Sequence, residues 1–469
     1  MSSPEGGIAA LTIADLSKFI ESKAISPVDL TEAYLQRIEA TEEDLNAFIT
    51  LTADHALNAA QEAADAIAKG EYRGPLHGIP FAAKDNFATA GIRTTSGSQA
   101  RLETVPMENA AALRALAQAG AIALGKANMT EWALESTGRN DFFGWALNPW
   151  DKGRMPGGSS SGCAAAVTAG NAPFALGTDT GGSIRVPSAL CGLSALKPTY
   201  DAVARHGTTT LSWSLDHIGA MAHTIEDVAL VMEALANSTQ HAGLPARRLN
   251  VYTECFTDGI REMRIGVPKA TVSTAVDPEV AVAFNQALQE LEGLGAHVTE
   301  VSLPDLDLVA ATCAAITITE AAAAHDATIR QEGDSYDPVI RRRIEAGLFI
   351  PGVTYLQAQR ARTLITRQVL SALQGVDVLA LPTVPVAAPS IEATAVDLGG
   401  MRMPVNAALP RLTQLFNLTG MPAASAPCGF NADGLPIGLQ IAGPAFADAQ
   451  VLRILHAFQQ ATDWHKRRP

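Results

Sequence analysis

Two short segments of this chain combine glycine and serine in a pattern that could support nucleophilic chemistry. They lie at Pro156–Gly162 and Gly177–Arg185, on either side of a small-residue segment. Glycines permit backbone conformations and close approaches that other residues do not. Each segment stands where a helix is expected to begin, with backbone N–H groups that have no partner within the helix. Together these features predict a serine nucleophile and an oxyanion hole.

Other interpretations of these segments, and of one further motif, fit their surroundings less well. Gly158–Gly162 matches the nucleophile-elbow pattern G-x-S-x-G, which would make Ser160 the nucleophile, but that motif follows a hydrophobic strand and here a loop precedes it. A flexible Gly/Ser linker is disfavoured because an alanine-rich helix follows directly at Cys163–Ala169. Gly120–Ala127 nearly matches a phosphate-binding loop, but Ala127 replaces the required Ser or Thr, and the interior of the segment is predicted to be an apolar strand.

The elements that must position the two segments alternate between helices and short apolar strands. The elements nearest to the motifs are predicted to be strands at Ile79–Lys84 and Pro173–Gly177 and a short helix near Val186–Leu190. This alternation indicates an α/β fold with helices on both faces of a mixed, mostly parallel central sheet. No linker divides the chain, so we expect one large domain over residues 1–469. Residues 237–262 and 331–353 are expected to be variable insertions.

Several motifs, in their order along the chain, resemble the amidase signature family. The family pattern is matched by Lys84-Asp85-Asn86, by the glycine-serine segment that begins at Pro156 and by the segment that ends at Arg185. Further similar segments follow to the C-terminus, and the resemblance extends from about Ala14 to Asp463. The resemblance implies the α/β fold of that family and hydrolysis of an amide by a Ser-Ser-Lys triad.

Carried onto this sequence, the resemblance makes Lys84 the base, Ser159 the bridging serine and Ser183 the nucleophile, with a cis peptide bond between Gly158 and Ser159. The residue types agree with these roles, because a serine hydroxyl needs a base and a lysine can serve only when neutral. Burial at the end of an apolar strand would lower the pKa of Lys84 from about 10.4. Ser159 would relay the proton from Ser183 to Lys84 and later return it to the leaving amine.

Residues near the two serines are expected to complete the site. The oxyanion would be bound by the backbone N–H groups of Thr180, Gly181, Gly182 and Ser183. Structural support without direct chemistry is expected from Asp179, Arg185, Ser160 and Ser161. The acyl pocket is expected to be lined by Met129, Trp132, Phe142, Phe143 and Trp213.

The leading functional interpretation is an amidase that hydrolyses a small or medium carboxylic acid amide to the acid plus amine or ammonia, through an acyl-enzyme on Ser183. The alternative is the A subunit of a glutamine-dependent tRNA amidotransferase, which uses the same triad to release ammonia from glutamine. Subunits of that kind carry an acidic residue for the glutamine amine shortly before the segment that resembles Asn417–Pro422. This chain has Pro410-Arg411 there, which favours the first interpretation. A binding protein without activity is disfavoured by the intact triad.

Composition bears on partners and location. The 469 residues include 34 Lys and Arg against 48 Asp and Glu, and the net charge of −14 disfavours general affinity for nucleic acid or anionic membranes. The five scattered cysteines have no metal-ligand spacing. No secretory signal is visible, and the apolar run 308–319 is too short to span a membrane. We therefore expect a cytoplasmic enzyme with a small-molecule amide substrate, no cofactor or metal, no nucleic-acid or membrane partner, and a homodimer as the default assembly.

Overall fold

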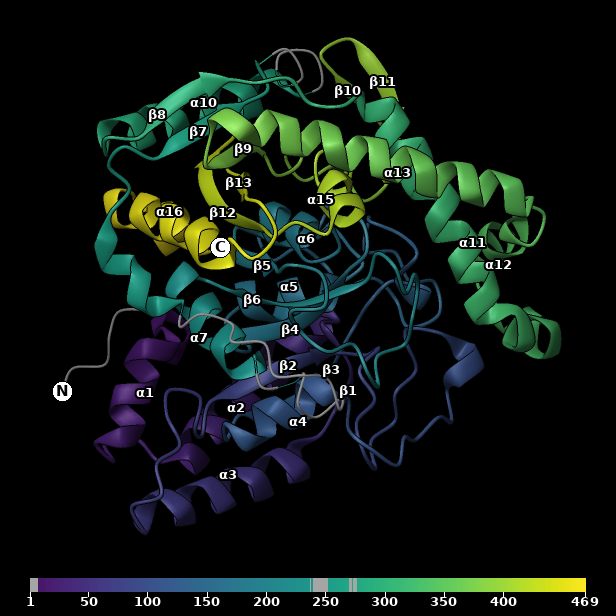
Figure 1. Cartoon of the computed structure of the whole chain (residues 1–469). Helices are drawn as coiled ribbons and strands as arrows, with labels where there is room; N and C mark the ends of the chain where they lie inside the picture. Colours follow the sequence, from purple (N-terminus) through teal and green to yellow (C-terminus); the bar gives the residue numbers. More distant parts are fainter. Residues whose placement is uncertain (1–6, 237, 239–251, 270–271, 273–275) are drawn as a thin grey trace.

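The computed structural model describes residues 7–236, 238, 252–269, 272 and 276–469. An 11-stranded sheet runs through the middle of the molecule (Figure 1). Its strands are β1 (Phe48–Leu51), β2 (Pro80–Lys84), β3 (Ile122–Ala127), β4 (Phe174–Asp179), β5 (Ser194–Lys197), β6 (His217–Ala222), β7 (Arg264–Val267), β8 (His297–Glu300), β9 (Val378–Pro382), β12 (Ala423–Phe430) and β13 (Pro436–Ala442). Their order across the sheet is β1-β3-β2-β4-β6-β5-β12-β13-β9-β7-β8. A separate hairpin consists of β10 (Ala395–Leu398) and β11 (Met401–Pro404).

The sheet is mixed, as expected from the sequence. Parallel pairs join β2 to β3 and β4, and β7 to β8 and β9. Antiparallel pairs add β1 at one edge and connect β4 to β9 through β6, β5, β12 and β13. This antiparallel centre is larger than helix–strand alternation alone indicates. One reason is that β12 and β13 form a hairpin, whose connection is too short for the helical crossover that parallel strands require.

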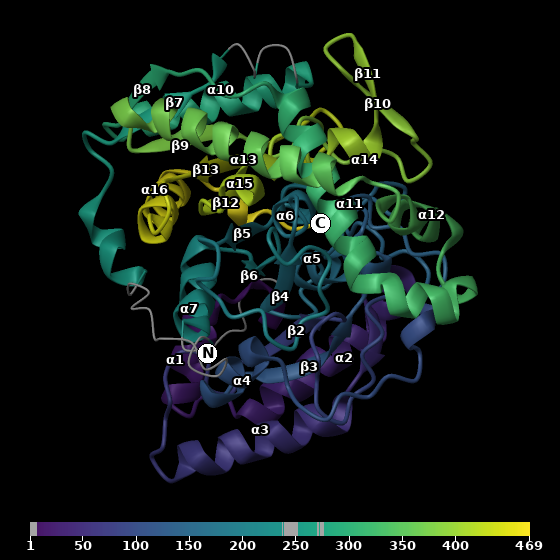
Figure 2. The same ribbon diagram turned by 45° about the vertical axis from the view of Figure 1, so that its right-hand side comes forward.

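Helices cover both faces of the sheet. They are α1 (Ile13–Glu21), α2 (Pro27–Leu45), α3 (Ala53–Ala68), α4 (Ala111–Gln118), α5 (Ser161–Thr168), α6 (Arg185–Cys191), α7 (Ile225–Leu235), α10 (Pro278–Gly293), α11 (Leu306–Glu332), α12 (Pro338–Gly347), α13 (Gly352–Ala372), α14 (Val405–Ala408), α15 (Gln414–Thr419) and α16 (Asp448–Ala461). In Figure 2, α7 and α16 lie on one side of the central strands and α5 and α6 on the other. The α/β class predicted from the sequence is therefore confirmed.

Helices α11, α12 and α13 pack together beside this layered core, at the right in Figure 1, and α11 and α13 also contact α15. The segment 331–353, expected to be an insertion, supplies the end of α11, all of α12 and the start of α13. Much of the other expected insertion, 237–262, lies outside the described residues. Residues 306–335 form one helix long and apolar enough to cross a membrane, but this helix packs against its neighbours, as core helices of the same composition do.

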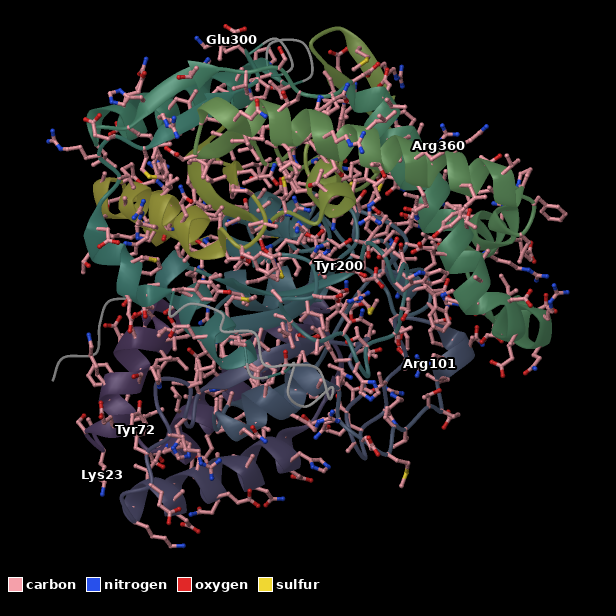
Figure 3. The ribbon with its side chains drawn as sticks, viewed as in Figure 1. Lys23, Tyr72, Arg101, Tyr200, Glu300 and Arg360 are labelled. Carbon is pink, nitrogen blue, oxygen red and sulfur yellow. The ribbon has the colours of Figure 1, made fainter. Side chains whose placement is uncertain are left out.

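Charged side chains such as Lys23, Glu300 and Arg360 project from the periphery of the molecule (Figure 3). A few cations are instead buried in or near the sheet. Lys197 Nζ donates to Pro198 O and Met421 O at 2.9 and 2.7 Å, and Lys126 Nζ lies 3.8 Å from Asp85 Oδ1. Because a buried cation is costly unless it is hydrogen-bonded or paired, the backbone around each one is constrained.

A close contact at the start of α5 generates a stability prediction. A Cβ added to Gly162 would lie 2.3 Å from Ala47 O and 2.4 Å from Asn128 N, which are backbone atoms. Gly162→Ala should therefore lower the free energy of unfolding by roughly 1–3 kcal/mol, as overpacking does. Urea denaturation followed by circular dichroism would measure this change.

The matched control is Gly293→Ala at the end of α10, where an added Cβ would have no atom within 4 Å. We expect this variant to be unchanged or about 0.5–1 kcal/mol more stable. Equal effects of the two substitutions would contradict the packing described for α5.

Candidate active site

Lys84 is the last residue of β2, where an apolar strand carries its side chain into the protein interior. Its side chain is fully buried. The Nζ atom donates to Ser159 Oγ and to Thr178 Oγ1, both at 2.8 Å. Thr178 reaches this position because β4 pairs in parallel with β2. The structure therefore brings together Lys84 and Ser159, as the sequence predicted, and adds a second hydroxyl that the sequence did not identify.

The environment of Lys84 favours its neutral form. Burial lowers the pKa of Lys84 to about 8, while Cys163, Asp179 and Asp216 act in the opposite direction. Desolvation therefore outweighs these neighbours, because removing water penalises the charged amine. A substantial fraction of the amine is then neutral at mildly alkaline pH, which is the form that can accept a proton.

The first glycine-serine segment places Ser159 beside Lys84. The peptide bond between Gly158 and Ser159 is cis, as the family resemblance implied. Ser160 N donates to Ser183 O at 3.2 Å, which ties this segment to the second one. Ser160 Oγ donates to Thr178 O at 3.3 Å. Ser161 Oγ is buried without a hydrogen-bond partner among the described residues, so the structural support expected from Ser161 does not come from its hydroxyl.

The second segment forms a tight turn between β4 and α6 that presents Ser183 to a cavity. Gly182 has φ 140°, and a Cβ there would lie 2.2 Å from Thr413 Oγ1. Only glycine satisfies both constraints. In the part of the chain that the structure describes, the backbone N–H groups of Gly181, Gly182 and Ser183 make no hydrogen bond, so they are free to bind an oxyanion.

A fully buried ion pair fixes this turn. Arg185 Nη2 lies 3.0 Å from Asp179 Oδ1, and Asp179 Oδ2 also accepts from the backbone N–H of Ile184 at 3.2 Å. Burial alone would raise the pKa of Asp179, but Arg185, Asn417 and Lys197 together outweigh burial and hold that pKa below its usual range. Arg185 also donates to Asn417 Oδ1 at 2.7 Å, which connects the turn to α15. The pair is positioned to brace the turn.

The hydroxyls of Ser159 and Ser183 do not hydrogen-bond to each other in the described chain. A relay between them therefore needs a small rearrangement when substrate binds, as catalytic contacts often do in ligand-free structures. The described residues contain no cluster of three or more His, Cys, Asp and Glu side chains that could hold a metal ion.

The cavity beside Ser183 has a volume of about 370 Å³ and mostly apolar walls. Thr180, Gly181 and Gly182 line it together with Ser183. The remaining walls come from α11, residues 133–136 and residues 404–414, with Leu211 and one residue of α12, Arg343. They include Ala310, Cys313, Ala314, Thr317, Ile318, Arg343, Pro404, Asn406, Ala407, Pro410 and Gln414. The only charged side chains among these described lining residues are Glu135 and Arg343.

None of the five residues expected to form the acyl pocket lines this cavity. Met129 and Trp132 are buried in an apolar cluster that borders the cavity, and there Trp132 packs against His325 and Tyr336. The other three, Phe142, Phe143 and Trp213, lie elsewhere, and both Phe142 and Trp213 are about half exposed. Large aromatic rings supply packing area to the core, so their residue type alone does not identify a pocket.

Comparison with known proteins identifies the family. A family model described as Amidase matches residues 29–452 of this chain. The chain belongs to the amidase signature family. As a member of that family it is a hydrolase that acts on the carbon–nitrogen bonds of amides, as the motifs implied.

Relatives of this amidase-family chain extend over its whole length. The A subunit of the glutamyl-tRNA(Gln) amidotransferase of Moorella thermoacetica is 39% identical over 489 residues, with 98% of each chain covered. The crystal structure of the corresponding protein from Thermotoga maritima is 32% identical with a TM-score of 0.80, covering 98% of this chain and 96% of that one. Another similar structure is described as a vestigial protein complex that reveals the evolutionary origins of an s-triazine catabolic enzyme. It is 33% identical with a TM-score of 0.91, and the match covers 96% of this chain and 98% of that one.

These relatives correct one expectation from the sequence. The net negative charge led us to expect no nucleic-acid partner, and the leading amidase interpretation led us to expect a small-molecule amide alone. That expectation is wrong, because the full-length curated relatives are subunits of a glutamyl-tRNA(Gln) amidotransferase. Net charge averages over the whole surface and says little about one interface or about a partner protein that binds the nucleic acid.

The buried pair at the active-site turn generates a second stability prediction. Asp179→Asn removes one charge and leaves Arg185 buried, which should lower the free energy of unfolding by about 3–5 kcal/mol. Guanidinium denaturation would measure the change. Asp307→Asn is the control, because Asp307 also pairs with an arginine, Arg411, at 2.8 Å but is 78% exposed, and exposed pairs contribute about 0–1 kcal/mol. Small and equal losses in both variants would show that the buried pair does not brace the turn.

Proposed function

We propose that this chain is the A subunit of a glutamine-dependent tRNA amidotransferase, in which it hydrolyses the side-chain amide of glutamine and releases ammonia. The observation that carries the proposal is the similarity to subunits of that enzyme. The Moorella thermoacetica subunit has 39% sequence identity to this chain over 98% of each protein. We further propose that the chain acts as one domain in the cytoplasm, together with partner subunits that bind glutamyl-tRNA. The continuous sheet, in which C-terminal strands lie between β5 and β9, supports the single domain.

The proposed reaction begins when Ser183 Oγ attacks the carboxamide carbon of glutamine. The hydroxyl proton passes through Ser159 to the neutral amine of Lys84, and the free N–H groups of Gly181–Ser183 stabilise the oxyanion. Lys84 returns the proton through Ser159 to the nitrogen, and ammonia leaves from the tetrahedral intermediate. A water molecule then hydrolyses the acyl-enzyme by the same proton path, and glutamate is released. The 2.8 Å hydrogen bond from Lys84 to Ser159 supports this path.

The charged pair in the cavity wall supports glutamine as the substrate. Arg343 Nη1 donates to Leu134 O at 2.6 Å and lies 3.5 Å from Glu135 Oε1. Burial lowers the pKa of Arg343 and raises that of Glu135, so both groups gain from a charged partner. Free glutamine carries a carboxylate and an ammonium group. We propose that Arg343 binds the carboxylate and that Glu135 binds the ammonium group.

This assignment accounts for the absence of an acidic residue at Pro410-Arg411. Pro410 lines the cavity, whereas Arg411 pairs with Asp307 at 2.8 Å and does not line it. A carboxylate for the substrate ammonium group would then come from Glu135, which approaches the cavity from a different part of the chain.

A second candidate function is the hydrolysis of an uncharged amide by the same triad. Two observations favour it. The mostly apolar walls of the cavity suit an aliphatic acyl group, and the TM-score is higher for the s-triazine-related structure, 0.91, than for the Thermotoga protein, 0.80. The two candidates differ in whether the cavity must recognise charged groups, so substrate kinetics can separate them.

Amide hydrolysis should depend on Ser183 and on the protonation of Lys84. Ser183→Ala should lower kcat by roughly 10⁴-fold or more, without changing the thermal melting curve. The wild-type kcat/KM should rise with pH through about 8, because the neutral amine is the base. Ammonia release measured between pH 6 and 10 would test both points. Near wild-type turnover of the alanine variant would move the nucleophile elsewhere, with Ser160 as the first candidate.

Arg343→Met should separate the two candidate substrates. If Arg343 binds the carboxylate, its loss should raise KM for L-glutamine by roughly 10-fold to 100-fold, the range for a hydrogen bond to a charged group. The kinetics for butyramide, which has a similar acyl chain but no charges, should change little. Steady-state assays with both substrates would measure this difference.

Equal changes for glutamine and butyramide would favour the second candidate. The amidotransferase proposal also predicts that glutamine hydrolysis increases when the chain is combined with the other subunits and glutamyl-tRNA. Absence of any complex in size-exclusion chromatography would contradict it.

A further inference from the structure

A second, much smaller cavity lies beside Thr178, one of the two residues whose hydroxyls accept from Lys84. Its volume is about 20 Å³, and its lining residues include Asn86, Thr178, Arg205, Thr208, Asp216 and His217. This volume is enough for one water molecule, which needs about 10–15 Å³. Most of the lining residues are polar, although the cavity lies in the interior between β4, β6 and the segment 205–216.

Three of the lining residues have a buried polar atom without a hydrogen-bond partner. These atoms are Asn86 Oδ1, Thr208 Oγ1 and His217 Nε2. Unpaired buried polar atoms are rare because each one costs free energy, so three around one cavity of this size point to a common partner. A water molecule that contacts them would satisfy all three.

The hydrogen-bonding capacity of the lining groups discriminates between possible occupants. His217 Nδ1 contacts Leu215 O at 2.6 Å, so Nδ1 carries the proton and Nε2 is an acceptor. Burial and the nearby Lys197 hold the pKa of His217 well below its usual range, which keeps the ring neutral. Asn86 Oδ1 is also an acceptor. The occupant must therefore donate hydrogen bonds.

The occupant must also accept a hydrogen bond. Thr178 Oγ1 already accepts from Lys84 Nζ at 2.8 Å and from Asn86 Nδ2 at 3.0 Å. Its own hydroxyl proton has no acceptor among the hydrogen bonds of the described residues, and Thr178 lines the cavity. An ammonium ion cannot accept a hydrogen bond from Thr178, whereas water can both accept and donate.

Asp216 also lines the cavity. Its Oδ1 accepts from Thr180 Oγ1 at 2.6 Å, and its Oδ2 accepts from Leu211 N at 3.0 Å. The guanidinium of Arg205 also lines the cavity but is engaged with Asp201 and with the hydroxyl of Tyr200, which is labelled in Figure 3. Thr208, Thr209 and Thr210 are only half-buried, so this wall extends to the surface.

We propose that this cavity binds one water molecule, which joins the Lys84–Thr178 hydrogen bond to Asp216 and carries protons between Lys84 and solvent. When the ammonium form of Lys84 is discharged, an N–H bond of Nζ breaks and Thr178 Oγ1 gains that proton. Thr178 passes its own hydroxyl proton to the water. The water turns one of its hydrogens from Asn86 Oδ1 to the carboxylate of Asp216 and passes that proton on, and Asp216 releases it outside. Lys84 thereby becomes neutral without using the Ser159 path.

The charged groups around Lys84 are consistent with a separate exit for the proton. Cys163 on α5, Asp179 at the end of β4 and Asp216 all influence the pKa of Lys84. Asp179 is paired with Arg185, and burial raises the pKa of the Cys163 thiol to about 12, so neither accepts a proton readily. Burial raises the pKa of Asp216 to about 6. Among these three, Asp216 is therefore the group suited to exchange a proton near neutral pH.

Two measurements on the full chain test the proposal. A high-resolution crystal structure should contain one ordered water within hydrogen-bond distance of Asn86 Oδ1 and His217 Nε2, and an empty cavity would overturn the proposal. The second measurement is the pH dependence of kcat for Thr208→Val, a substitution that removes one water contact without changing the shape of the side chain. It should lower kcat roughly three- to tenfold below pH 8, a range that corresponds to one hydrogen bond. The rate should converge with the wild-type rate above pH 9, where Lys84 is already neutral.

Thr31→Val is the matched control. Thr31 Oγ1 is also buried without a partner, but Thr31 lies in α2 and does not line the cavity. This variant should keep the wild-type pH profile. Two results would overturn the role of the water in proton transfer. One is that Thr208→Val loses activity by the same factor at every pH, and the other is that its pH profile equals that of the wild type although the crystal structure contains the water. Because the readouts are crystallographic and pH-dependent, they do not rely on which amide is the natural substrate.

Discussion

The arrangement of this site depends on an amine that must be buried and still able to lose its proton. Lys84 has no exposed surface, so burial disfavours its charged form. Its amine still has hydrogen-bond partners, because the hydroxyls of Ser159 and Thr178 both accept from it. The apolar strand β2 buries the side chain and so disfavours its charged form, while the two hydroxyls provide the amine with hydrogen-bond partners. Lys197, in the same sheet, is buried but bound by two backbone carbonyls, and it lines neither cavity near the site.

Several features of this arrangement could be predicted from the sequence. The strand that ends at Lys84, the small helix after Ser159 and the turn that holds Ser183 all have local signals: apolar runs, alanine-rich periodicity and glycines where close contacts require them. Thr178 and Asp216 have no such signal. They reach Lys84 because β4 pairs with β2 and with β6, and strand order depends on contacts between residues far apart in the sequence.

The substrate cavity was mispredicted for a different physical reason. Aromatic residues such as Trp132 were expected in the cavity, but large side chains fill space and pack into the core. The cavity lies instead where the walls are built from small side chains, among them Ala310, Ala314 and Ala407. Small residues rarely stand out in a sequence. These three line the cavity only because α11 and α14 come together near the turn.

The helices α11 and α12 lie apart from the elements that hold the proposed triad. They contribute walls of the cavity, whereas Lys84, Ser159 and Ser183 belong to strands and turns of the central layers. Substitutions in these helices therefore change the shape of the cavity without replacing a residue of the proposed triad. This division offers a route for evolutionary divergence. Relatives about one-third identical to this chain include both a subunit of a glutamyl-tRNA(Gln) amidotransferase and a protein linked to the origins of an s-triazine catabolic enzyme.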